Sequence, residues 1–319
     1  MLDRDTLIRE QLATEYEQIG LSEARKQQLI VSLAPRKRTP AFAWRRGTSR
    51  VLIAGTAALA LAGSAVAVTS STGITPAEMA SDLFGQPAKT EIVDKIGRPI
   101  GASDTSNGVR ITADSIIGDA RNFAVVYTIE KEDGSAFDLP EPSDSGLLRL
   151  NFQHSMTRIP GDAGLGGSAY FFDRDPGDNA IQYVEQSSVF GIDSLQGKTA
   201  KVKLKDLSSV GGTIVAEGTW KLSFDIGYEE MSKELPAGQR AGETTVTRAE
   251  ASPLAINLEY EGPNSQLGPA EATLIGGNAI PLTSGPLSCH QTLGKQQCST
   301  SLSFPHLMDP EQVQELRLN

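Results

Sequence analysis

The pattern of hydrophobic and polar positions changes twice along this chain. Residues 3–34 repeat apolar side chains at helical spacing, and residues 51–68 are continuously apolar. Beyond residue 108, apolar and polar side chains alternate as they do in β-strands. These patterns predict, in order, short amphipathic helices, a membrane-spanning helix and a β-rich part.

The continuous apolar stretch is the strongest signal in the sequence. It reads VLIAGTAALALAGSAVAV, and no charged residue follows Val51 until Glu78. As a helix it covers about 27 Å, close to the ~30 Å hydrocarbon core of a bilayer. Arg45, Arg46 and Arg50 precede it without an acidic neighbour, which by the positive-inside tendency places the N-terminus in the cytoplasm. We therefore expect a single-pass plasma-membrane protein with an extracellular C-terminus.

A cleaved secretory signal is the alternative interpretation of this stretch. Ala65-Val66-Ala67 has the form of a cleavage site, and Arg45-Arg46 hints at twin-arginine export. The preceding segment of about 50 residues is much longer than such signals need, which favours an uncleaved anchor. A buried helix of a soluble protein, the third alternative, would leave the one-sided cationic flank unexplained.

The segment before the apolar stretch predicts two short helices. Their apolar positions form a stripe made of Ile8, Leu12, Tyr16, Ile19, Leu29 and Leu33. Helices of this length are marginal alone in water, so the stripe predicts binding to a partner protein. A disordered tail with transient helix is the alternative. No Cys or His precedes His154, which excludes a zinc site in this segment.

The charge is divided unevenly between the two ends of the chain. The net charge is −10, yet residues 1–50 carry ten Lys and Arg against six Asp and Glu. Residues 69–319 carry nineteen Lys and Arg against thirty-three Asp and Glu. An acidic exported part argues against nucleic acid as its partner, because phosphate contacts need clustered cations.

A complete helix start follows the apolar stretch. Thr75 can cap the helix, Pro76 takes its first position and Glu78 closes a capping box. Gly85 supplies the C-terminal stop. We expect this helix to be a juxtamembrane stalk.

The rest of the chain predicts a mainly β fold. Expected strands cover residues 109–117, 123–129, 147–152, 169–173, 181–189, 201–207, 220–226 and 254–260. Residues 108–130 and 242–262 echo one another, each with an extended stretch, a turn and an alternating strand. We therefore expect two immunoglobulin-like β-sandwich units.

The expected organisation has four parts. Residues 1–50 form the cytoplasmic helical segment, residues 51–69 the transmembrane helix, residues 74–235 a membrane-proximal β domain and residues 240–319 a distal one.

The two cysteines predict a disulfide. A two-residue turn at residues 293–294 would pair Thr292 with Lys295 and, three pairs further along, Cys289 with Cys298. Such a pair is not hydrogen-bonded, and its Cα separation of about 4.5 Å suits a disulfide. A metal site that uses both cysteines with His290 and His306 is the alternative, although neighbouring strand residues point to opposite faces.

Catalytic signatures are not found in the sequence. It holds no HExxH, GxSxG or phosphate-loop motif, so we expect no enzyme, no cofactor and no metal. The glycine-rich residues 161–167 are typical of a strand connection. Asp173, Asp175 and Asp178 suggest a solvated turn, with a calcium site as the alternative.

Several phrases carry a resemblance to a known family. ITPAEMASDLFG, GVRITADSIIGDARNFAVVYTIEKEDG, GTWKLSFDI and SPLAINLEYEG, in this order, resemble bacterial membrane-anchored anti-sigma-factor-like proteins with an uncharacterised immunoglobulin-like ectodomain. The resemblance implies a signal-transducing regulator of transcription. Its N-terminal segment would hold an extracytoplasmic-function sigma factor, and its ectodomain would sense an unknown extracellular ligand and control release of the sigma factor through proteolysis. The zinc motif of the zinc-binding anti-sigma group is missing.

A protein of another class is the alternative. It would be a membrane-anchored or exported protein that binds or structures the envelope, and its N-terminal segment would only set the topology in the lipid bilayer.

Overall fold

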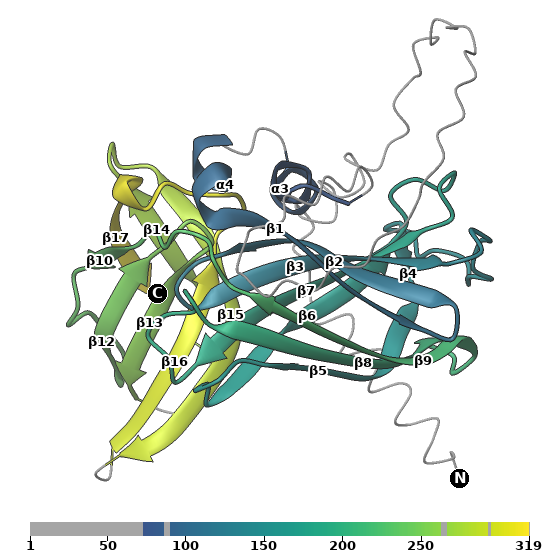
Figure 1. Cartoon of the computed structure of the whole chain (residues 1–319). Coiled ribbons are helices and arrows are strands. Elements are labelled where there is room, and N and C mark those ends of the chain that lie inside the picture. Colours follow the sequence, from purple (N-terminus) through teal and green to yellow (C-terminus); the bar gives the residue numbers. More distant parts are fainter. Residues whose placement is uncertain (1–72, 86–89, 263–266, 293–294, 319) are drawn as a thin grey trace, which may run out of the picture.

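The computed structural model describes residues 73–85, 90–262, 267–292 and 295–318. Two short helices precede strands that form two units, of which the first ends with β9 and the distal unit begins with β10 (Figure 1). The fold is mainly β, which confirms the class predicted from the sequence.

Several predictions lie outside the described residues. These are the two cytoplasmic helices with their apolar stripe, the arginines Arg45, Arg46 and Arg50, and the span at residues 51–69. Among the helices that the structure does describe, none has the length and apolar character needed to cross a bilayer.

The first helix begins and ends where the sequence predicts. In α3 (Pro76–Phe84) the Thr75 hydroxyl accepts the Glu78 N–H, while the Glu78 carboxylate accepts the Thr75 N–H at 3.0 Å. Gly85 ends the helix at φ 75°, a left-handed conformation that glycine adopts easily. A second helix, α4 (Thr90–Ile96), follows and was not expected.

The helix that was predicted to be a juxtamembrane stalk packs against the first unit. Met79, Ala80, Leu83 and Phe84 are buried on the helix face that meets the sheet. Arg174, next to β6, pairs with Glu78 at 3.3 Å and with Asp82 at 3.4 Å. The apolar stripe of the helix is buried against the sheet, so the helix is part of a folded core.

The first unit consists of two sheets packed face to face. The larger sheet has the order β1 (Gly97–Ser106), β2 (Val109–Gly118), β3 (Asn122–Lys131), β7 (Ile181–Phe190), β6 (Gly164–Phe172), β4 (Leu147–Leu148). The smaller sheet has the order β5 (Leu150–Arg158), β8 (Thr199–Ser209), β9 (Ile214–Asp225). The alternation that predicts strands at residues 123–129 and 220–226 corresponds to buried faces. One core contains Phe123, Val125, Tyr127, Ile129, Trp220, Leu222, Phe224 and Ile226.

The distal unit is a sheet that folds over its own core. Its order is β10 (Lys233–Leu235), β12 (Thr244–Ala251), β13 (Ala255–Glu261), β16 (Lys295–Ser303), β15 (Ala279–Thr292), β14 (Ala270–Leu274), β17 (Val313–Leu318), with β11 (Arg240–Ala241) beside β12. The short helix η1 (Pro310–Gln312) precedes β17. Lys233 Nζ donates to the Val313 carbonyl at 3.0 Å and so links the first strand of the unit to the last.

The passage between the units lies earlier than the predicted boundary. Residues up to 235 were expected in the first unit, but β10 pairs with β12, and Leu235 is buried in the distal core. Tyr228 still belongs to the core of the first unit. The connection therefore falls between Tyr228 and Lys233.

A third core joins the two units, and we call it the junction core. It contains apolar residues of α3 and α4, the outer face of the larger sheet at Ile117, Val126 and Val184, and Leu254 and Leu307 of the distal unit. The helices and the distal unit thus cover the same face of the larger sheet (Figure 1).

Candidate functional site

The turns of two hairpins meet where the first unit contacts the distal unit. One turn joins β2 to β3 and holds Asp119, and the other joins β12 to β13 and holds Ser252. These are the two segments that echo one another in the sequence. Both pairs of strands are antiparallel with one register shift, between Ala113 and Ser115 in the first and between Val246 and Arg248 in the second.

Asp119 is the centre of this contact. Its carboxylate is fully buried and accepts the Arg121 N–H at 2.8 Å, the Asn122 N–H at 2.7 Å and the Ser252 hydroxyl. Burial raises the pKa of Asp119, and the hydrogen bonds from Ser252, Arg121 and Asn122 act in the opposite direction. Tyr228 donates its hydroxyl to the Asp119 carbonyl at 2.8 Å, which fixes the turn from the core side.

Two asparagines continue the contact between the units. Asn122 Nδ2 donates to Asn257 Oδ1 at 2.8 Å, and Ser301 on β16 donates to the same oxygen at 2.8 Å. Ser188 on β7 donates to Asn122 Oδ1 at 2.7 Å. These side chains are all buried, so each hydrogen bond is made away from water.

A cleft of about 250 Å³ opens beside this network. The end of β7 and the loop after it line one wall, and the outward side chains of β13 and β16 line the other. Arg121 and Glu259 pair across it at 2.9 Å. Arg248, on the neighbouring strand, lies 3.8 Å from Glu259 and 3.9 Å from Asp193 on the loop.

Two buried donors at the cleft have no acceptor among the described residues. Asn257 is 3% exposed, and its Nδ2 makes no hydrogen bond in the described part of the chain. The same holds for Nε of Arg121, whose side chain is 12% exposed. A buried donor without an acceptor costs about 1–3 kcal/mol, so an acceptor oxygen that reached these donors from the cleft would be stabilised there.

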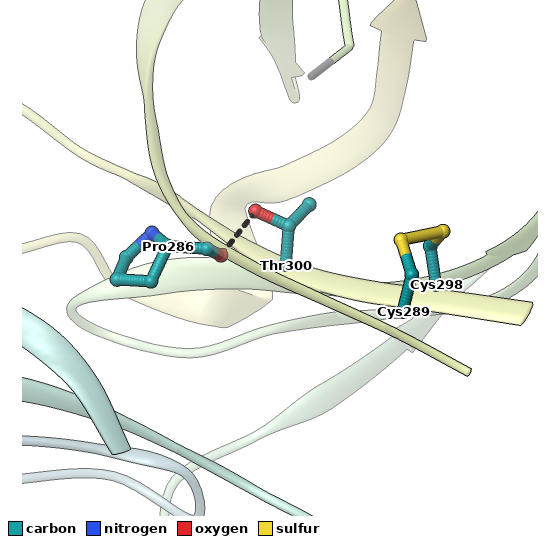
Figure 2. The surroundings of a disulfide bond; sticks show 4 residues. All are labelled: Pro286, Cys289, Cys298 and Thr300. Carbon is teal, nitrogen blue, oxygen red and sulfur yellow. Dashed lines mark hydrogen bonds between the residues drawn. A yellow bond between two sulfur atoms is a disulfide. The ribbon is translucent and has the colours of Figure 1, made fainter. Parts of the chain in front are cut away.

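The predicted disulfide lies beside the cleft and is confirmed. Cys289 on β15 is bonded to Cys298 on β16, with the Cα atoms 4.1 Å apart (Figure 2). The strand register is the predicted one, with Gln291 opposite Gln296 and Cys289 opposite Cys298. Cys298 lines the cleft, so the crosslink holds one wall in place. The alternative metal site is excluded for these two cysteines because both sulfur atoms are used in the bond.

A second contact holds the same hairpin of the distal unit. The Thr300 hydroxyl donates to the Pro286 carbonyl at 2.8 Å, at the register shift of β15 (Figure 2). The Pro286 ring packs on Gly166 of β6, where an added Cβ would lie 2.5 Å from the ring. Gly166 therefore lets the hairpin approach the first unit closely. It belongs to the glycine-rich stretch that was expected to be a strand connection.

Hydrogen bonds within the acidic turn between β6 and β7 stabilise its conformation. Asp175 accepts the Gly177 N–H at 3.0 Å, and Asp178 accepts the Ala180 N–H at 2.8 Å. Burial, followed by the charges of Asp178 and Asp175, raises the pKa of Asp173. Within the described ranges, no cluster of His, Cys, Asp or Glu side chains has the arrangement of a metal site.

Sequence reasoning missed the residues of the cleft. The sequence GDARN is typical of a solvent-exposed turn, and nothing local in GDARN or SPLAIN indicates that Asp119 and Asn257 are buried. The internal echo was the available signal, because it pairs these two turns. The predicted partner-binding residues Ile8, Leu12, Tyr16, Ile19, Leu29 and Leu33 lie outside the described residues.

Comparison with known proteins gives little similarity. No family model matches the chain, and no curated protein does. A crystal structure described as the conserved domain protein from Bacillus anthracis matches at a TM-score of 0.49 and 14% identity, over 65% of this chain and 72% of that chain.

Proposed function

We propose that this protein is a single-pass membrane signalling protein that resembles an anti-sigma factor. Residues 1–50 hold an extracytoplasmic-function sigma factor in the cytoplasm, the helix at residues 51–69 crosses the plasma membrane, and the β-rich part senses a ligand outside. We also propose that its two units are related immunoglobulin-like sandwiches, which the echoing hairpins support.

The observation that carries the proposal is the position of α3. This helix follows the proposed span directly and is packed in the junction core together with Leu254 and Leu307 of the distal unit. Protein interiors are close-packed, so a change in the angle between the units alters the packing around α3. A change in the angle between the units would therefore be transmitted to the segment that follows the proposed membrane span.

Polar contacts attach both α3 and the residue before its N-cap to the first unit. Ser115 on β2 donates its hydroxyl to the Ile74 carbonyl, immediately before the helix. Arg174 pairs with Glu78 and Asp82 on the helix itself. The segment next to the proposed span is thus held by the first unit and touches the distal one.

The cleft is the proposed sensing site. Arg121 belongs to the first unit and Asn257 to the distal one, so a ligand that accepts from both donors is bound by both units at once. Its preference for one arrangement of the units would shift the population towards that arrangement. We expect a small polar ligand that bears carboxylate, carbonyl or phosphate oxygens.

Affinity purification of the full-length chain from its host tests the cytoplasmic half of the proposal. A sigma factor, identified by mass spectrometry, should copurify with the tagged protein. Leu12→Asp combined with Leu29→Asp should abolish copurification, because a charge in the apolar stripe removes its contact with the partner. Gln18→Asp combined with Gln28→Asp adds the same charge on the polar faces and should retain the sigma factor.

Copurification that survives the Leu12→Asp and Leu29→Asp changes would refute the proposed contact. Absence of any sigma factor would favour the second candidate, an anchored or exported envelope-binding or structural protein. The cleft is the observation that supports this candidate, because ligand binding between the two units requires no cytoplasmic partner.

A further inference from the structure

The outer face of the smaller sheet of the first unit concentrates positive charge. Along β8, alternate residues point into the core, among them Val202 and Leu204, which are buried. The residues between them, Lys201, Lys203 and Lys205, are exposed. The period of two in a strand places all three on the same outward face.

The neighbouring strands add to this charge. Across the three strands β5, β8 and β9, the rows read Arg158–Lys201–Ser223, Met156–Lys203–Lys221 and His154–Lys205–Thr219. Residues directly opposite one another share a face of the sheet. We call the surface formed by Arg158, Lys201, Lys203, Lys205 and Lys221 the lysine face.

Few carboxylates neutralise the positive charges of the lysine face. Like charges directly opposite one another destabilise a sheet, and Lys203 is opposite Lys221 while Lys201 is opposite Arg158. In the ranges that the structure describes, no carboxylate lies within ion-pair distance of Lys203 or Lys221. Lys205 pairs with Asp206 at 3.4 Å.

Two further acidic side chains lie at the border of this surface. Asp104 accepts the Lys221 backbone N–H at 2.7 Å, and Asp225 accepts the Thr199 hydroxyl at 2.7 Å. Both carboxylates are thereby engaged by other donors at the edge of the sheet.

Protection of a sheet edge does not explain these lysines. Lysines on edge strands prevent unwanted strand pairing, but β8 is the middle strand of its sheet. General solubility does not explain them either, since residues 69–319 carry thirty-three Asp and Glu against nineteen Lys and Arg. A concentrated basic surface on an acidic body is typical of a binding site for anions.

We propose that the lysine face binds a linear phosphodiester polymer of the cell envelope. The cationic rows repeat every two residues, about 6.7 Å along the strand, so successive rows can meet successive phosphates of an extended chain. Binding places a phosphate between Lys203 and Lys221 and thereby relieves their repulsion. Lysine supplies point charges without base-edge or sugar specificity, which fits a repetitive polymer.

The orientation of the surface favours a polymer over the membrane that anchors the protein. α3 and the start of the described chain lie on the outer side of the larger sheet, whereas the lysine face is the outer side of the opposite sheet (Figure 1). A span that precedes Gly73 therefore places the lysine face away from its own membrane. This inference rests on the proposed export of the β-rich part and names a ligand class that it contacts.

Fluorescence anisotropy with the full-length protein in a neutral detergent tests the inference. The probe is labelled synthetic poly(glycerol phosphate). We expect binding that weakens steeply between ~50 and ~200 mM salt, as counterion release requires. Lys203→Glu should lower the affinity about tenfold, because it reverses the charge at the centre of the face.

Lys95→Glu is the matched control, since Lys95 is an exposed lysine on α4, on the other side of the unit. It changes the net charge equally and should leave the affinity within about twofold. Equal loss in both variants, or no binding by the wild-type protein, would overturn the inference.

Competition separates the possible sources of phosphate. Unlabelled poly(glycerol phosphate) should displace the probe, while dihexanoyl phosphatidylglycerol at the same phosphate concentration should not. Displacement by the lipid, or stronger displacement by single-stranded DNA, would assign the face to another ligand and overturn the inference. None of these measurements depends on a sigma factor, so failure here and failure of the proposed function are distinguishable.

Discussion

Ser252 donates its hydroxyl to the carboxylate of Asp119, from which it is separated by 133 positions in the sequence. Each residue lies in the turn of a hairpin, and the two hairpins are the segments that echo one another. Both side chains are fully buried. The contact therefore joins equivalent points of the two units and fixes their relative position beside the cleft.

Ser252→Ala should destabilise the protein by about 1–3 kcal/mol, because it removes one donor from a buried carboxylate and leaves the acceptor without replacement. Urea unfolding followed by tryptophan fluorescence measures the loss. Ser223→Ala, at an exposed serine on β9, is the control and should change the stability by less than about 0.5 kcal/mol. A Ser252→Ala protein as stable as the wild type would show that the carboxylate does not depend on this bond.

The carboxyl group of Asp114, beside the segment that follows the proposed span, should make the stability of the protein depend on pH. Burial raises the pKa of Asp114 from 3.8 to about 6, although the carboxylate accepts hydrogen bonds from Thr128 and from the Ile74 backbone. The charge of Glu130 raises it further. The folded protein thus binds this proton more tightly than the unfolded chain. The resulting stabilisation is complete below pH 3.8 and is lost as the pH rises through about 6.

Asp114→Asn should therefore make the protein more stable than the wild type by about 1–3 kcal/mol at pH 8, because the amide keeps an acceptor oxygen without the buried charge. The difference should disappear near pH 4, where the wild-type carboxyl is protonated. Urea midpoints measured across this pH range provide the check. A constant difference at all pH values would contradict the assignment of the titration to Asp114.

Gly118 allows Tyr228 to reach the turn that holds Asp119. An added Cβ at Gly118 would lie 2.3 Å from the tyrosine ring, so Gly118→Ala must displace the ring and its hydrogen bond to the Asp119 carbonyl. We expect a loss of about 1–3 kcal/mol in the free energy of unfolding. Gly227→Ala is the control, because an added Cβ there meets no atom within 4 Å. Thermal unfolding of the two variants should separate them clearly.

Local sequence signals account for much of the fold. The capping box of Thr75 and Glu78 was predicted from four consecutive residues, and the inward face from Phe123 to Ile129 was predicted from alternation. The disulfide followed from the spacing of Cys289 and Cys298. In each case the physical cause lies within one element or one hairpin, where short-range spacing determines which atoms meet.

Long-range packing accounts for what the sequence did not reveal. β1 was missed because GRPIGASDTS contains Pro99 and only Ile100 as a large apolar residue, and it forms an edge of the larger sheet. The packing of α3 was not predicted because its partners in the junction core include Ile117 and Leu254, far along the chain. The cleft was missed for the same reason, since Arg121 and Asn257 line it together only after both units have folded.

The lysine face yields a prediction in which stability and binding change in opposite directions. Lys203 has Lys221 directly opposite and Lys201 and Lys205 at the neighbouring outward positions of its own strand. Lys203→Glu replaces repulsion with attraction at the centre of this group, so the protein should become more stable by about 0.2–1 kcal/mol at low salt. The gain should shrink as salt is added, because exposed charges are screened.

Thermal unfolding of Lys203→Glu, measured together with polymer binding, distinguishes loss of the binding site from misfolding of the variant. A variant that lost binding because it misfolded would unfold at a lower temperature than the wild type. We expect the reverse, a higher unfolding temperature together with weaker binding, because the same four lysines repel one another in the free protein and attract phosphate in the complex. Lower stability together with weaker binding would show that Lys203 acts through the fold of the sheet and would remove the support for a site on this face.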